Sequence, residues 1–115
     1  MAAVKIINLE AGLPTVEEAR RSLAEELRKA RREGVRVLKL IHGYGSSGKG
    51  GALCVGLRKS LQLRKKEKVI CDFFPGDAFS IFNARVLELL EVVPQLRGDP
   101  DLNATNEGVS IVWVK

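Results

Sequence analysis

A glycine-rich stretch near the middle of this chain joins a β-rich segment to a helix-like segment, and it constrains the path of the chain on both sides. It reads IHGYGSSGKGGALCVGLRKSL from Ile41 to Leu61, with five glycines between His42 and Ala52. The preceding segment, Val35 to Ile41, alternates around charged residues in a β-branched setting, and leucines then repeat at positions 53, 57 and 61. A strand that turns sharply into a helix is a building unit of α/β folds. The pattern leaves open whether this turn cradles an anion or only permits the change of direction.

The rest of the chain continues the alternation of strands and helices. Thr15 to Glu33 carries an apolar stripe at helical spacing; Thr15 and Glu18 form a capping box at its start, and Gly34 is suited to end it. The other predicted elements are strands at Val4 to Leu9, Val69 to Phe74 and Val109 to Val114, and a strongly apolar helix from about Asp77 to Val93. We predict an α/β fold, a two-layer sandwich in which a small mixed four-stranded sheet and its helices follow in β-α-β-α-β-α-β order. We expect the functional site at the edge of the sheet formed by the loops that follow the strands.

Length and composition limit the classes of protein to which this chain can belong. At 115 residues and 45% hydrophobic content it has material for one core, so we predict a single domain over residues 1–115. No apolar run is long enough to cross a bilayer, and we expect a cytoplasmic protein without a membrane partner. Cys54 and Cys71 lack the spacing of a zinc site or a disulfide framework and are expected to be reduced packing residues. The net charge of +5 is compatible with a polyanionic partner.

One interpretation of the glycine-rich stretch is the phosphate-binding loop of a nucleoside triphosphatase. Gly43 to Lys49 fits the first seven positions of GxxxxGK[ST]. Gly50 then stands where a Ser or Thr hydroxyl would hold a magnesium ion, and glycine offers no ligand. Asp72 could supply a carboxylate ligand for the magnesium ion, but a four-stranded sheet is small for a nucleoside triphosphatase. This interpretation is therefore disfavoured, and no metal site or cofactor is predicted.

A second interpretation places a phosphodiester at the turn. His42 stands at the C-terminal end of a strand, where we expect its side chain to emerge at the sheet edge and not in the core. Backbone N–H groups of the turn and of the helix that follows would form an anion pocket, with Lys49 and Arg58 neutralising charge. An imidazole beside that phosphate could donate a hydrogen bond or transfer a proton. In a third interpretation the glycines only allow the turn, and His42 caps or packs.

The residues around His42 resemble those of the Smr family, the small MutS-related domain. The chain carries His42-Gly43-Tyr44-Gly45, then SSGKGGAL and GLRKSL, similar to the HGxG motif, glycine-rich loop and LR-containing helix of that family. TVEEA from Thr15 and the closing NEGVSIVWV extend the resemblance to about four-fifths of the chain, with the apolar helix from Asp77 to Val93 and its following loop as an elaboration. The resemblance implies a fold similar to the C-terminal domain of bacterial translation initiation factor three. It also implies binding or nicking of DNA or RNA.

The first motif of the family's nucleases is altered in this chain. Such members usually bear an LDxH-like motif at the end of the first strand, facing the HGxG loop, whereas this chain reads INLEAG from Ile7. Asn8 falls where the resemblance places the acid, and Glu10 where it places the histidine. Asn8 offers hydrogen bonds but no proton transfer, and Glu10 would act as a base only if burial raised its pKa. Cleavage needs a group for the nucleophile and another for the leaving oxygen or developing charge, so we expect weakened or lost catalysis.

The basic residues fall into two groups. The first predicted helix interleaves arginines with glutamates, and the pairs Glu17 with Arg21 and Glu25 with Lys29 are expected largely to cancel. The second group continues from the glycine-rich turn and is opposed only by Glu67. It comprises Arg58, Lys59, Arg64, Lys65, Lys66 and Lys68. We expect a phosphate backbone that crosses the turn to continue onto this second group.

We predict a nucleic-acid-binding domain, a monomer or weak homodimer, that grips DNA or RNA phosphates through the turn and the basic helix. The predicted contacts are Gly43, Tyr44, Gly45, Ser46, Lys49, Arg58, Lys59 and Lys65. Tyr44 would stack on an unpaired base, whereas Phe73, Phe74, Phe79, Phe82 and Trp113 are expected in the core. One alternative is an endonuclease, acid/base or metal-assisted, with His42 and Glu10 as catalytic residues. Another is a protein-interaction module that docks a partner or a second copy through the apolar helix.

Overall fold

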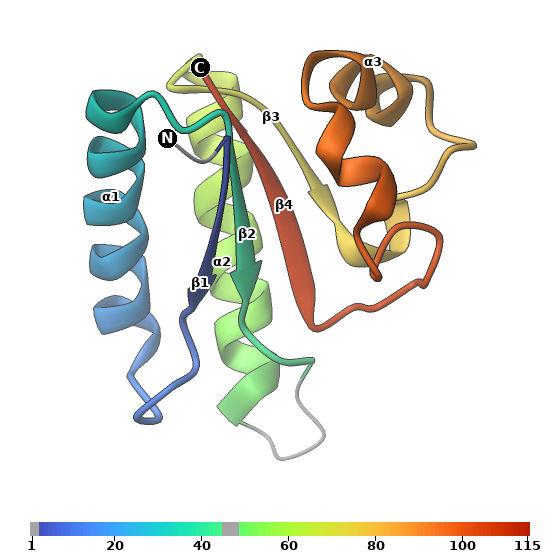
Figure 1. Cartoon of the computed structure of the whole chain (residues 1–115). Helices are drawn as coiled ribbons and strands as arrows, with labels where there is room; N and C mark the ends of the chain where they lie inside the picture. The colour runs from blue at the N-terminus through green and yellow to red at the C-terminus, as the bar shows by residue number, and fades with distance from the viewer. Residues whose placement is uncertain (1–2, 45–48) are drawn as a thin grey trace.

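The structure is a computed structural model that describes residues 3–44 and 49–115 (Figure 1). Within these residues, four strands form one sheet in the order β1-β2-β4-β3. They are β1 (Val4–Asn8), β2 (Val37–Ile41), β3 (Ile70–Pro75) and β4 (Val109–Val114). β1 is parallel to β2, while β4 is antiparallel to both β2 and β3. The predicted small mixed sheet is confirmed, and the ends of β1 and β2 meet the start of β4 at its lower edge in Figure 1.

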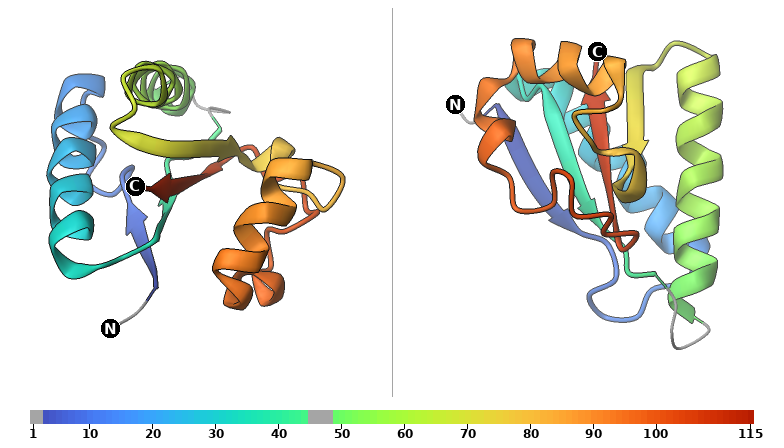
Figure 2. Two further views of the ribbon diagram at one scale, coloured as in Figure 1. Left: turned by 90° about the horizontal axis from the view of Figure 1, so that it is seen from above. Right: turned by 90° about the vertical axis from the view of Figure 1, so that its right-hand side faces the viewer.

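Helices α1 (Val16–Glu33) and α2 (Lys49–Lys66) pack against each other on one face of the sheet, with their axes crossing obliquely (Figures 1 and 2). The capping box predicted for α1 is confirmed, since Thr15 and Glu18 each accept the other's backbone N–H, at 3.1 and 3.0 Å. Gly34 ends the helix with a φ of 74°, which favours glycine. Gly56 allows α1 and α2 to approach closely, because a Cβ on it would come within 2.4 Å of Val16 Cγ1.

Side chains alternate between the two faces of the sheet, and each face has its own core. Leu38 and Leu40 on β2 pack into the core that α1 and α2 share. Val37 on β2 and Ile111 on β4 belong to a second core on the other face, formed with α3 (Ala84–Val92). Helices therefore cover both faces, and α3 adds a partial third layer to the two layers predicted (Figure 2).

The third helix is shorter than predicted. A 3-10 turn, η1 (Gly76–Ala78), follows β3, and Asn83 then caps α3 by accepting the Arg85 N–H at 3.0 Å. Phe79 is buried, but Phe82 is 95% exposed ahead of the cap, so the predicted placement of Phe82 in the core is wrong. The helix buries Val86, Leu89 and Leu90, and is followed by η2 (Pro94–Gly98). These three side chains are thus covered by the chain's own sheet, whereas Phe82, Leu87 and Val92 remain exposed.

The two cysteines differ in their surroundings, although both are free thiols. Cys54 on α2 is buried, as expected. Cys71 is exposed on the edge strand β3, where the pairing register shifts between Ile70 and Asp72, and the prediction that it packs is wrong. In the described part of the chain, no helix combines the length and apolar character that crossing a membrane requires.

Candidate functional site

His42 follows β2 and lies inside the protein. Its side chain is fully buried, because it continues the alternate positions of Leu38 and Leu40 and points to the face that α1 and α2 cover. The expectation that it emerges at the sheet edge is therefore wrong. Its Nε2 lies 2.8 Å from Ser110 Oγ on β4, and its Nδ1 lies 2.8 Å from the Gly43 carbonyl oxygen. The imidazole joins the end of β2 to β4 and closes the turn.

These two contacts define the proton positions on the ring. A carbonyl oxygen only accepts, so Nδ1 donates its proton to Gly43, and Nε2 of the neutral ring accepts the Ser110 hydroxyl. Burial lowers the pKa of His42, and the Arg58 charge lowers it further, against the Gly43 hydrogen bond and the Glu10 charge. The ring is therefore neutral at pH 7, and both nitrogens already have partners. It positions the turn and has no nitrogen free for a phosphate.

The described part of the glycine-rich turn directs its amides inward. The N–H groups of His42 and Gly43 both donate to the Gly108 carbonyl, at 3.0 and 3.1 Å. Gly43 has a φ of +74°, and a Cβ there would come within 2.4 Å of Glu10 Oε2, so both the backbone and the neighbouring carboxylate require glycine. These two amides are not available to an anion. Two further predicted contacts, Gly45 and Ser46, lie outside the described residues, as does the side chain of Lys49.

The end of β1 brings Glu10 beside this turn. Asn8 Oδ1 accepts the backbone N–H groups of Glu10 and Ala11 at 3.0 and 3.1 Å, so the Asn8 side chain caps the chain reversal after β1. The Leu9 N–H continues the ladder to β2 by donating to the Ile41 carbonyl at 2.8 Å. The segment from Asn8 to Glu10, which stands in place of the LDxH-like motif, is therefore a turn that holds the Glu10 carboxylate over Gly43.

A hollow of about 480 Å³ opens at the same place, lined by Glu10, Ile41, Gly43, Tyr44 and residues 105–109. We call Glu10, His42, Gly43, Tyr44 and Glu107 the loop edge. Tyr44 is 62% exposed, and the Glu107 carboxylate beside it raises the pKa of its phenol. Among the described residues, the lining contains two carboxylates and no cation. The hollow itself therefore disfavours an anion.

The predicted cations near the start and middle of α2 have different surroundings. Arg58 is half-buried, and its Nη2 donates to the Glu107 carbonyl at 3.0 Å, which fastens α2 to the segment before β4. Lys59 is exposed, and so is Lys66 two turns further along the helix. Lys59 and Lys66 are therefore open to a solvent-side partner, whereas Arg58 has a structural role.

Asp72, considered above as a magnesium ligand, contacts two cations. Lys65 Nζ lies 2.9 Å from one of its oxygens and Arg85 Nε 3.0 Å from the other. Burial acts to raise the pKa of Asp72, but the hydrogen bonds from Lys65 and Arg85 outweigh it, and the pKa is lowered. Arg85 also stacks over the Trp113 ring, 4.8 Å from its centroid. Asp72 is thus a neutralised structural carboxylate, and Lys65 is held to β3.

A buried ion cluster, which was not predicted from the sequence, joins β2 to the segment after η2. Lys39 on β2 is 5% exposed and contacts the carboxylates of Asp99, at 2.9 Å, and Asp101. Burial acts to lower the pKa of Lys39, but these two carboxylates raise it above its ordinary value, and Lys39 in turn lowers the pKa of Asp101. The cluster anchors the segment that leads to residues 105–109. The sequence does contain a signal for a buried lysine. Lys39 interrupts an apolar strand and shares the alternate positions of Val37 and Ile41.

The fold and the loop edge define a small α/β domain in which an HGYG turn is locked between β2 and β4. A family model of the Smr domain matches residues 11–77, which is more than half of the chain, and the chain belongs to the Smr domain family. The crystal structure of the Smr domain of Thermus thermophilus MutS2 is similar in fold, with a TM-score of 0.60 and 23% identity over 96% of this chain and 98% of that chain. No curated protein matches the sequence. Membership of the family supports a nucleic-acid-binding or nuclease-like domain in general.

Proposed function

We propose that this Smr domain binds the phosphate backbone of nucleic acid along the exposed basic face of α2 and does not cleave it. The observation that carries the proposal is the charge of α2, which has six basic residues and no acidic one. Lys59 and Lys66 are exposed and seven residues apart, which places them on the same side of the helix. A backbone that follows this side meets cations at both ends without passing a carboxylate of the helix.

The surroundings of His42 support binding without cleavage. A general acid or base must reach the proton that it transfers, within about 3 Å or through one water. His42 is buried and hydrogen-bonded at both nitrogens, and Asn8 uses its side chain to cap a turn. Glu10 is left as the titratable group over Gly43, and a single carboxylate does not supply both proton transfer and charge stabilisation.

Fluorescence anisotropy with a labelled single-stranded RNA or DNA tests the binding. Each cation that meets a phosphate of a single strand should contribute about −0.7 to the slope of the logarithm of affinity against the logarithm of salt, so Lys59 and Lys66 alone should give roughly −1.4. Lys59→Gln with Lys66→Gln should reduce this slope by about 1.4. As a matched control, Arg36→Gln with Arg97→Gln removes two exposed cations away from α2 and should leave it unchanged. A flat salt dependence, or no binding at low salt, would contradict the proposal.

The same preparation tests the absence of cleavage. Supercoiled plasmid and labelled RNA are incubated with the wild type and with Glu10→Gln, each with and without EDTA. Equal, background-level product from both proteins is expected. Nicking by the wild type that disappears in Glu10→Gln would instead establish the endonuclease alternative, with Glu10 as its base.

A further inference from the structure

Charge on α1 is paired partly along the helix, where the predicted Glu17–Arg21 pair is present at 4.0 Å, and partly with β1. The acidic side faces β1, where Lys5 Nζ lies 3.3 Å from Glu26 and 3.7 Å from Glu33. Lys29 pairs with Glu26 at 3.8 Å, not with the predicted Glu25. The carboxylates at positions 26 and 33 are therefore directed to β1, away from α2.

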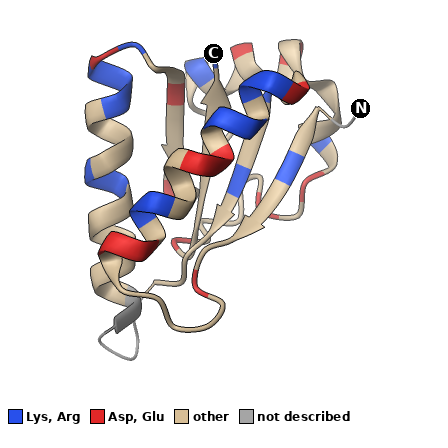
Figure 3. Ribbon diagram, turned by 90° about the vertical axis from the view of Figure 1, so that its left-hand side faces the viewer, with Lys and Arg blue, Asp and Glu red and all other residues tan. Residues whose placement is uncertain are grey.

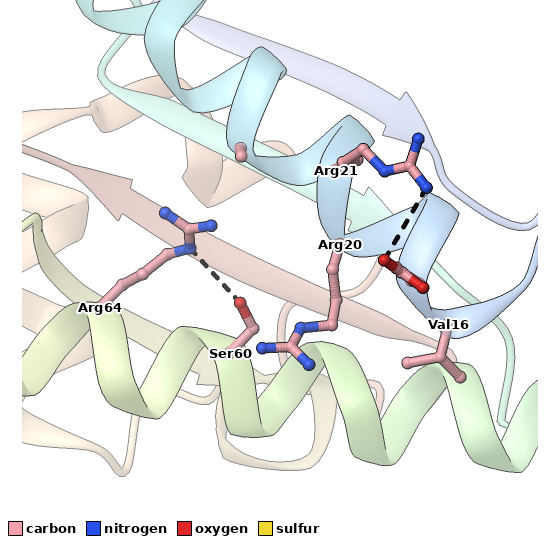
Figure 4. Close-up of a pocket in the computed structure, with 7 residues that line it drawn as sticks. Val16, Arg20, Arg21, Ser60 and Arg64 are labelled. Carbon is pink, nitrogen blue, oxygen red and sulfur yellow. Dashed lines mark hydrogen bonds and ion pairs between the residues drawn. The ribbon is translucent and has the colours of Figure 1, made fainter.

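The other side of α1 forms a groove with α2. A hollow of about 730 Å³ is lined by Val16, Glu17, Arg20, Arg21, Ala24, Ser60 and Arg64. Figure 4 shows Arg20 extending from α1 toward α2, and Ser60 and Arg64 entering the same space from α2. Arg64 Nε lies 3.4 Å from Ser60 Oγ, which orients the guanidinium. We call Arg20, Ser60 and Arg64 the arginine groove.

Two cations of this groove have no counter-ion within the described structure. The lining carboxylate, Glu17, lies 4.0 Å from Arg21, and no described carboxylate lies within 4.0 Å of Arg20 or Arg64. Figure 3 shows this side of the molecule, with acidic bands on α1 but none within α2. The groove therefore combines positive charge with a shape that admits a small anionic group.

The environment of Arg64 shows that this arrangement has an electrostatic cost. Burial lowers the pKa of Arg64, and the charges of Arg20 and Arg28 lower it further, against the opposing effect of Glu67. Arg64 is half-buried, so its charge is less screened by water than that of a fully exposed residue. An anion in the groove would relieve the repulsion, and a guanidinium presents paired N–H donors that match phosphate oxygens.

We propose that the arginine groove is a second phosphate-binding site, in which Arg20, Arg64 and the Ser60 hydroxyl hold backbone phosphates of the nucleic acid. This proposal rests on the proposed function and adds a path for the polymer. The groove lies on the α1 side of α2, while Lys59 and Lys66 lie on its outer side, so one backbone can cross both. The strand would then pass over the helices and not through the hollow of the loop edge, where Glu10 and Glu107 repel it.

The test compares wild type, Arg20→Gln with Arg64→Gln, and the control Arg36→Gln with Arg97→Gln in the anisotropy salt series. Removing two phosphate contacts should lower the slope by about 1.4 and weaken binding about 25-fold at 0.1 M salt, at 0.7 per contact. The control should match wild type. Arg20→Gln alone, at an exposed position, should show about half of the effect on a logarithmic scale and guards against misfolding caused by the change at Arg64.

Two further measurements separate failure of this site from failure of the proposed function. Inorganic phosphate should shift the Ser60 amide and Arg64 Nε–H resonances of the wild type, and not the Ser60 amide of the double variant. If wild type binds nucleic acid but the double variant behaves as the control, the groove proposal is overturned and the proposed function stands. If phosphate shifts these resonances while no polymer binds, the groove is an anion site and the proposed function fails. Equal displacement of the polymer by polyglutamate of the same charge would indicate an acidic protein partner and overturn the assignment to nucleic acid.

Discussion

The loop edge and the arginine groove differ in how fully their polar groups are satisfied within the protein. At the loop edge, the His42 ring and the Gly43 amide have partners inside the chain, and the neighbouring Asn8 side chain caps the turn that carries Glu10. In the arginine groove, Arg20 and Arg64 lie together without a described counter-ion. The described polar groups around His42 are thus paired within the chain and the charge left there is negative, on Glu10 and Glu107, whereas the arginine groove retains unpaired positive charge. The HGYG motif is thus explained by the geometry that the chain needs at this point, whereas the unpaired positive charge of the arginine groove indicates a site for an anionic partner.

The largest expected effect is the loss of stability on replacing His42. His42→Ala would leave a cavity and remove partners from the Ser110 hydroxyl and the Gly43 carbonyl, at a cost of about 3 kcal/mol. Lys59→Ala, at an exposed position of α2, should change the free energy of unfolding by less than about 0.5 kcal/mol. Urea unfolding of both variants provides the comparison. Equal stabilities would mean that the imidazole is a solvent-facing functional group after all.

A second, smaller effect is the dependence of stability on pH. The folded-state pKa of His42 lies below its ordinary value of 6.5, chiefly because of burial and then because of Arg58. As the pH falls through 6.5, the unfolded chain binds a proton at this histidine before the folded protein does. Stability should therefore decrease as the pH falls from 6.5 toward the folded pKa, by up to about 1.4 kcal/mol per pH unit.

The measurement is urea unfolding of wild type and His42→Gln at pH 7.5, 6.5 and 5.5. Glutamine keeps a hydrogen-bonding side chain but does not titrate, so the stability difference between the two proteins should shrink as the pH falls. Arg58 and Glu10 act on the same imidazole and remain in both proteins. Parallel curves would show that folding does not change the proton affinity of His42.

Local features of the fold were predictable, because their signals lie within a few residues. Thr15, Glu18 and Gly34 identify the ends of α1 through contacts three or four residues apart. The alternation of Leu38, Leu40 and His42 predicts burial of the imidazole, whereas its position at a strand end predicts exposure. The inference from strand end to exposure fails here because the ring points to the sheet face that α1 and α2 cover and is hydrogen-bonded to Ser110 on β4.

The arginine groove was not predictable in the same way. The spacing of Glu17 and Arg21 correctly predicted a pair along α1. The Glu25–Lys29 pair was not found, because Lys29 pairs with Glu26, and Glu26 and Glu33 also meet Lys5 on β1. Which neighbour a charged side chain meets depends on the strand or helix packed beside it, and local spacing does not contain that information. The family resemblance predicts contacts at the loop edge, because the HGxG motif lies there, and it assigns no binding residue to α1.

The smallest expected effect is that of Arg20→Gln on the free energy of unfolding. Its sign is opposite to that of His42→Ala, because a substitution in the arginine groove should stabilise the protein and one at the loop edge should destabilise it. Removing an exposed cation from among like charges should raise the free energy of unfolding by about 0.3 kcal/mol at low salt. The gain should vanish near 1 M salt, where screening acts over about 3 Å. Arg36→Gln, outside the groove, should show no such gain, and paired urea titrations of both variants at 20 mM and 1 M salt measure the difference. A loss of stability in Arg20→Gln would assign Arg20 a structural partner and make the groove as closed as the loop edge. A gain would mean that Arg20 lowers the stability of the folded protein. This is expected for a cation whose partner is a separate, negatively charged molecule.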